Sequence, residues 1–151
     1  MKKRIQIQHL EKRMSLFAQA GEFPAPNSGW IKAVRTALRM TMQQLAKKLG
    51  VSKQSIADLE KREQEDAVTL RSLKEAANAL DMKLVYGFVP KDGSIDNLIE
   101  RKARIMAEQI VARTSNSMKL EDQENSKSRL KNAIEERTQR IKEQMPKSLW
   151  D

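Results

Sequence analysis

Segment 43–60 carries two short helical patterns separated by a glycine turn, and few folds accommodate this register. Thr41 precedes the first pattern as a helix cap, and Gln44 three residues later completes a capping box. Gly50 supplies the positive φ that a sharp exit from a helix often needs, and Ser52 caps the second helix. The apolar positions expected to face inward are Leu45, Ala46, Leu49, Val51, Ile56 and Leu59. We therefore predict two helices that cross closely and leave the outward residues of the second helix free for contacts.

Helical periodicity extends this pair into a compact α-domain over residues 29–80. An apolar stripe with i, i+3/i+4 spacing starts at Trp30 and predicts a preceding helix, with this tryptophan as a core anchor. Thr69 caps a further helix that runs to Leu80. The sequence therefore predicts four short helices around one small core.

Outside this domain, the sequence predicts one strand and three more helices. The Pro-containing segment 22–29 ends an N-terminal helix over 6–20, and helical spacing returns over 95–113 and 121–145. Segment 83–90 is rich in β-branched and aromatic residues and is predicted as a strand, which pairs across a dimer or packs on the helical domain. The expected domains are 1–28, an N-terminal helix and linker; 29–80; and 81–151, a strand with C-terminal helices for dimerisation or partner binding.

The composition points to an anionic partner. Across 151 residues, 29 Lys and Arg oppose 20 Asp and Glu, and the net charge of +9 lies mostly in the first half. Nucleic acid is therefore the first partner to expect. The chain has no cysteine, one histidine and five widely spaced glycines, so no catalytic site, metal site or cofactor site is expected. No apolar run is long enough to span a membrane, and a cytoplasmic location is expected.

Segment 43–60 and its basic flanks resemble the helix-turn-helix of phage-repressor-type (Xre/Cro family) regulators, from Trp30 to about Leu80. The resemblance implies a domain that binds double-stranded DNA, with the second motif helix in the major groove. The residues that would face the bases are Lys53, Gln54, Ser55 and Asp58. The Gln54 amide suits a bidentate pair with adenine, and Asp58 suits the cytosine amino group. Lys53 suits guanine acceptors or a phosphate.

Other residues of the motif are expected to position the protein on the DNA backbone. They are Thr41, Gln43, Ser52 and Lys61, with Arg62 as a further basic residue. Alternatively, Arg62 forms a surface ion pair with Asp58 one turn earlier. Diffuse positive charge comes from Arg35, Arg39, Lys47 and Lys48, each interpreted as part of a solvated face.

A second resemblance covers nearly the whole chain and rests on segments 29–38, 84–90 and 117–123, which are similar to the family called mobile mystery protein A. It implies a DNA-binding protein of mobile or island DNA, encoded beside a Fic-domain protein in a pair that looks like a toxin and an antitoxin. In that arrangement the first half of the chain would repress the operon and the second half would contact the Fic partner.

Ser117 and Glu121 match part of the helix motif that silences many Fic proteins, in which Ser or Thr, three residues and Glu are followed by Gly or Asn. Asp122 stands at the last place and departs from that pattern. The family's glutamate pairs with an arginine that otherwise holds a nucleotide phosphate. The same residues also fit an ordinary helix start, with Ser117 as the cap and Glu121 in the first turn.

From these patterns we expect a mostly α protein: a lambda-repressor-like helix-turn-helix domain with one short β-strand and C-terminal helices. The expected function is a homodimeric, sequence-specific repressor that autoregulates an operon containing a Fic-domain protein. Its operator should contain two half-sites about one helical turn apart. The alternative is an antitoxin-like protein that binds and inhibits the Fic partner, with DNA binding secondary.

Overall fold

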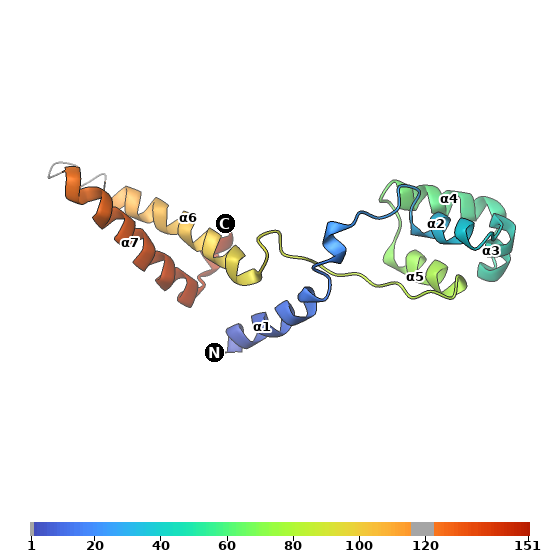
Figure 1. Cartoon of the computed structure of the whole chain (residues 1–151), viewed down its shortest axis with the longest axis horizontal. Coiled ribbons are helices and arrows are strands. Elements are labelled where there is room, and N and C mark those ends of the chain that lie inside the picture. Colours follow the sequence, from blue (N-terminus) through green and yellow to red (C-terminus); the bar gives the residue numbers. More distant parts are fainter. Residues whose placement is uncertain (1, 116–122) are drawn as a thin grey trace. The chain divides into compact units, whose positions relative to one another are not determined.

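The computed structural model describes residues 2–115 and 123–151, which form two compact units (Figure 1). The four-helix unit comprises residues 18–87. The hairpin unit comprises residues 2–17 together with the described part of 88–151. Among the helices described, none is both long enough and apolar enough to cross a membrane.

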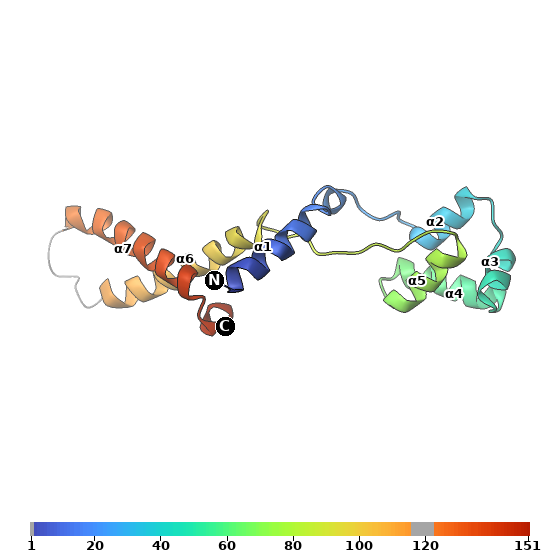
Figure 2. The same ribbon diagram turned by 90° about the horizontal axis from the view of Figure 1, so that it is seen from below.

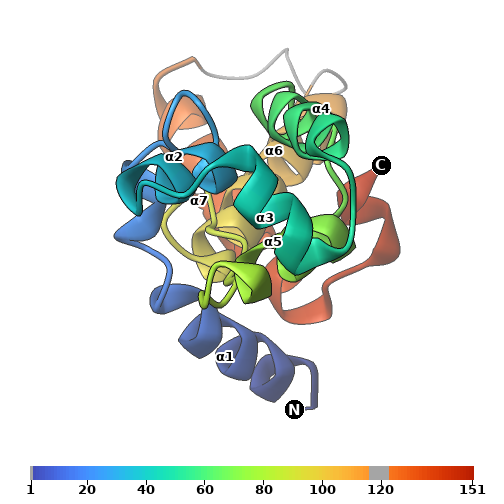
Figure 3. The same ribbon diagram turned by 90° about the vertical axis from the view of Figure 1, so that its right-hand side faces the viewer.

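The four-helix unit consists of η1 (Ala20–Glu22), α2 (Trp30–Ala37), α3 (Met42–Leu49), α4 (Lys53–Gln64) and α5 (Leu70–Ala79). Helices α2 and α3 each pack against α4 and α5 (Figures 2 and 3). The buried residues of its core are Ile31, Leu45, Ala46, Ile56, Leu59, Ala76 and Leu80. The prediction of Trp30 as a core anchor is wrong, because this first residue of α2 is 58% exposed and the inward stripe starts at Ile31.

The ends of α3 and α4 have the local geometry that the sequence predicts. The Thr41 hydroxyl accepts from the Gln44 N–H at 3.1 Å, while the Gln44 side chain accepts from the Thr41 N–H at 2.8 Å. Gly50 ends α3 with φ 67°, in the left-handed region, and Ser52 caps α4 by accepting from the Ser55 N–H at 3.1 Å. These caps fix where α4 begins, and therefore which of its residues lie in its first turns.

Segment 83–90 is not a strand, and this prediction is wrong. Its residues belong to no helix or strand, and strands are absent throughout residues 2–115 and 123–151. The physical reason is that β-branched and aromatic residues favour extended backbone, whereas a strand also needs a neighbouring edge for its hydrogen bonds. Tyr86 nevertheless has one contact within the four-helix unit, because the Lys74 ammonium lies 5.7 Å from the centroid of its ring.

The hairpin unit consists of α1 (Lys2–Ser15), α6 (Ile95–Ser115), α7 (Gln123–Gln144) and η2 (Lys147–Trp150). Helices α6 and α7 run side by side (Figures 1 and 2). The buried apolar residues are Ile99, Ala103, Ala107, Ile141 and Leu149. The two alanines share one face of α6, where small side chains allow a close helix crossing. Ser117 and Glu121 lie outside the described residues.

Ion pairs join α6 to α7 and to the segment that precedes α6. Arg104 donates to Glu135 at 3.0 Å and lies 3.5 Å from Glu100, and this guanidinium lowers the pKa of the Glu135 carboxyl. Arg101 holds Asp92 at 2.8 Å and likewise lowers the pKa of that carboxyl. These pairs are exposed and add little stability, but they balance the charge of the hairpin locally.

Candidate nucleic-acid interface

The first turns of α4 present a polar face to solvent. Ile56, Leu59 and Glu60 are the buried residues of this helix. The residues predicted to face the bases, Lys53, Gln54, Ser55 and Asp58, are all exposed. Because the buried residues pack into the core, the orientation of α4 is fixed. Its exposed residues therefore point to solvent and form a surface that can enter a DNA groove.

Gln54 and Asp58 are joined by a hydrogen bond along this face. The Gln54 Nε2 atom donates to Asp58 Oδ1 at 3.1 Å. A carboxylate only accepts, so the amide nitrogen of Gln54 must face Asp58. Gln54 then keeps its Oε1 acceptor and its second N–H free, which are the two groups that a bidentate pair with adenine requires.

The partner of Asp58 is therefore Gln54 and not Arg62, which corrects the alternative of an Asp58–Arg62 ion pair. No ion pair of Arg62 occurs within the described residues. Arg62 and Lys61 are both exposed in the last turn of α4. The structure gathers Ser55, Asp58, Lys61 and Arg62, together with Glu65, around one shallow hollow.

The hydroxyl residues of the predicted interface already have partners in the helix caps. Ser52 Oγ lies 2.9 Å from Ser55 Oγ in addition to accepting from the Ser55 N–H. Thr41 is engaged in its capping box, and Gln43 is exposed in the first turn of α3. The Thr41 hydroxyl accepts its cap bond and still has its own hydrogen to donate to a phosphate. Of the Ser52 and Ser55 hydroxyls, one donates to the other, and the second keeps its hydrogen for a DNA contact.

A buried ion pair fixes α4 to α2 beneath this face. Arg35 Nε donates to Glu60 Oε1 at 2.5 Å, Nη2 donates to Oε2 at 3.2 Å, and Nη1 donates to the Met40 carbonyl at 2.9 Å. Arg35 is 7% exposed and Glu60 is 4% exposed. The interpretation of Arg35 as part of a solvated face is therefore wrong. The i, i+4 spacing of Ile31 and Arg35 places both on the buried side of α2, which is the signal that could have indicated this.

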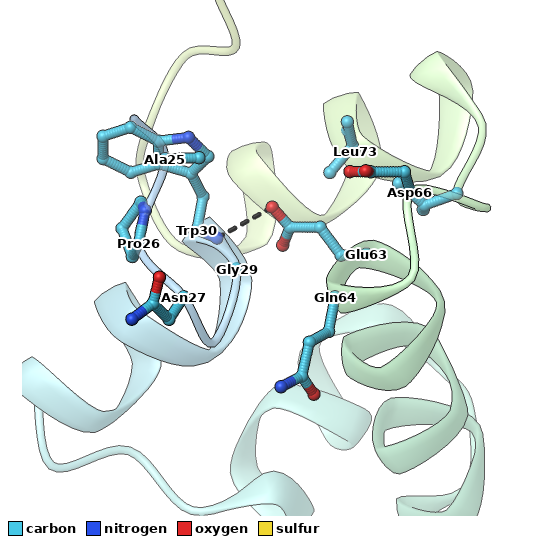
Figure 4. A pocket seen from close by; sticks show the side chains of 10 residues that line it. Ala25, Pro26, Asn27, Gly29, Trp30, Glu63, Gln64, Asp66 and Leu73 are labelled. Atoms are coloured by element: carbon cyan, nitrogen blue, oxygen red, sulfur yellow. Dashed lines mark hydrogen bonds between the residues drawn. The ribbon is translucent and has the colours of Figure 1, made fainter. Parts of the chain in front are cut away.

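A second carboxylate of α4, Glu63, also acts on α2 (Figure 4). Its two oxygens accept from the Trp30 N–H at 2.7 Å and the Ile31 N–H at 2.8 Å. These N–H groups belong to the first turn of α2, where a negative charge is also favoured by the helix dipole. The sequence gives no sign of this contact, because the partners of Glu63 lie more than thirty residues away along the chain.

A comparison with known protein families agrees with this geometry. The model of a helix-turn-helix family matches residues 31–86, which contain nearly all of α2 to α5. No curated protein and no solved structure matches the chain. The four-helix unit thus contains a helix-turn-helix domain, the DNA-binding domain of a class of transcription regulators. Within that class, the match supports the Xre/Cro type of regulator.

Proposed function

We propose that this protein is a sequence-specific transcriptional repressor that binds double-stranded DNA through α4. The observation that carries the proposal is the exposed polar face of α4, held by capped ends within a segment that matches a helix-turn-helix family. A net charge of +9 supports it, because a basic protein is attracted to the phosphate backbone of DNA.

In the proposed complex, the first turns of α4 lie in the major groove. Gln54 pairs with adenine through its free Oε1 and N–H, while Asp58 holds the amide in that orientation. Lys53 donates to a guanine or a phosphate, and the Ser55 hydroxyl contacts a base edge. The backbone contacts come from Thr41, Gln43, Ser52, Lys61 and Arg62.

We further propose that the protein binds its operator as a homodimer. A two-fold dimer presents two copies of α4 to half-sites about one helical turn apart. The extended segment 83–90 supplies apolar surface for such an interface, with Val85 68% exposed and Phe88 82% exposed.

A titration of the full chain against its own upstream promoter tests this function. Fluorescence anisotropy would be measured at two salt concentrations, with scrambled DNA of equal length as the control. We expect a preference for the promoter of roughly a thousandfold or more, and two chains bound per operator. Equal, salt-sensitive binding to both DNAs would contradict a sequence-specific repressor.

Replacing Gln54 and replacing Lys61 should have different effects. We expect Gln54→Ala to weaken operator binding by roughly 1–3 kcal/mol and to relax the preference at one base pair, because it removes a base contact. Lys61→Ala, on the same helix, should weaken binding to all sequences alike, because it removes a phosphate contact. Titrations of both variants against operator, single-base variants and random DNA measure this. Equal losses on operator and random DNA for both variants would refute Gln54 as a base reader.

A second proposed role concerns the hairpin unit, which has its own apolar core separate from that of the four-helix unit. The resemblance of the chain to mobile mystery protein A supports binding of a Fic-domain protein through residues 81–151, with Ser117 and Glu121 as candidate contacts. The full chain would then bind a Fic protein encoded beside it. If a Glu121→Ala variant inhibits the Fic protein as strongly as the unchanged chain does, Glu121 is not part of the contact.

A further inference from the structure

Helix α1 carries a disproportionate share of the positive charge of the chain. Its 14 residues contain Lys2, Lys3, Arg4, Lys12 and Arg13. Against these five cations stands one acid, Glu11, which leaves four of the chain's nine net positive charges on this single helix. So local a concentration is typical of a surface that meets a polyanion.

One side of α1 is anchored in the hairpin unit. Ile7 packs against the apolar core of that unit, and Ile7, Glu11 and Met14 are the half-buried residues of the helix. The Glu11 carboxylate accepts from the Asp96 N–H at 3.1 Å, at the start of α6. The single acid of α1 thus lies on the side of the helix that faces α6.

The opposite side of α1 is cationic and exposed. At 3.6 residues per turn, Lys2, Lys12 and Arg13 fall on the face away from Ile7, and all three are exposed. Within residues 2–115 and 123–151, none of the five cations of α1 forms an ion pair. Arg101, Arg104 and Lys142 of the hairpin all do.

The placement of these charges also works against the helix itself. The first turn of α1 contains no acid, and Lys2, Lys3 and Arg4 lie at the positive end of the helix dipole. Each such cation is unfavourable there, and the three also repel one another. An external anion would relieve both effects. The cluster of cations in the first turn of α1 is therefore explained by the binding of an anion and not by the stability of the helix.

We propose that α1 is a second DNA-contacting element that binds backbone phosphates. This inference rests on the proposed DNA-binding function and extends its contact surface to the hairpin unit. A helix of 14 residues is about 21 Å long, and duplex DNA carries one charge per ~1.7 Å, so separate phosphates lie within its length. Ile5 and Leu10, each about half exposed, point in different directions. Ile7 is packed on the hairpin core, and Ile5 is the one large apolar residue of α1 that shares the face of Lys2, Lys12 and Arg13, which is too little for an amphipathic membrane helix.

The test compares two triple variants of the full chain with equal loss of charge. The first is Lys2→Gln, Lys12→Gln and Arg13→Gln on the outer face of α1. The control is Lys131→Gln, Arg137→Gln and Arg140→Gln, three exposed cations of α7 in the same unit. Affinity is measured at several salt concentrations on a duplex that extends about two helical turns beyond the operator. Circular dichroism of each variant confirms that the helices are retained.

We expect the α1 variant to lower the slope of log K against log salt by about 2–3, at about 0.9 for each phosphate that the variant no longer neutralises. The α7 variant should leave the slope near that of the unchanged chain. Equal slopes for all three proteins, or equal reductions in both variants, would overturn the proposal. A second result would also overturn the proposal. If the α1 variant binds DNA like the unchanged chain but no longer binds anionic phospholipid vesicles, the surface that α1 contacts is a membrane. If the unchanged chain shows no preference for its promoter, the proposed repressor function fails, but the salt slopes still decide whether α1 touches DNA.

Discussion

Removing either partner of the buried Arg35–Glu60 pair should destabilise the four-helix unit by about 3–5 kcal/mol, because the remaining charge is left buried without a counter-ion. Both side chains are less than a tenth exposed, and the pair joins α2 to the helix that carries the proposed base readers. We therefore expect Arg35→Ala and Glu60→Ala to lower both the unfolding free energy and the affinity for the operator. Urea denaturation in a Trp150→Phe background measures the first, because fluorescence then reports on Trp30 in this unit.

Two further variants separate the burial of charge from the loss of packing. Arg71→Ala removes an exposed arginine of the same unit and should change the stability by less than about 0.5 kcal/mol. The double variant Arg35→Met with Glu60→Leu removes both charges and should be more stable than either single alanine variant. It should still fall short of the unchanged chain, because the Met40 carbonyl loses its donor from Arg35. A double variant less stable than both single variants would contradict this account.

The sequence predicts those parts of the site whose interactions join residues close together in the chain. Thr41 with Gln44, Gly50 and Ser52 lie within a few residues of the groups that they satisfy, so spacing alone identifies the caps and the turn. The exposed face of α4 follows from the same register. The family match over residues 31–86 supports the class of domain that this local pattern predicts.

The features that the sequence does not reveal depend on distant partners. Arg35 meets Glu60 across 25 positions, and although the spacing from Ile31 indicates the buried side of α2, a single sequence does not identify Glu60 as the partner. Segment 83–90 has the composition of a strand but no neighbouring strand to pair with in the described part of the chain, and the β-propensity of its residues does not show whether such a neighbour exists. Nor does composition place α1 beside α6, because that contact depends on the packing of Ile7 and on the hydrogen bond that Glu11 accepts from Asp96 at the start of α6.

Gly29→Ala should cost about 2–4 kcal/mol of stability, through backbone strain and the loss of charge-assisted hydrogen bonds at the start of α2. Gly29 has φ 86° and ψ 160°, a conformation open almost only to glycine. A Cβ at this position would lie 2.9 Å from both Cδ and Oε1 of Glu63. That carboxylate accepts the N–H groups of Trp30 and Ile31, so moving it leaves the first turn of α2 without its partner. Urea denaturation in the same Trp150→Phe background measures the loss.

Gly50→Ala is the matched control, because it also places a side chain at a positive φ but meets no steric obstacle. Gly50 has φ 67°, and an added Cβ would meet nothing within 4 Å. Only the left-handed backbone then opposes alanine, at a cost of about 1–2 kcal/mol. Glu63→Ala should lose much of the same stability as Gly29→Ala, and combining the two should cost less than their sum, since both break the same contact. Equal costs for Gly29→Ala and Gly50→Ala, with additive effects at Gly29 and Glu63, would show that the Glu63 carboxylate does not hold the start of α2.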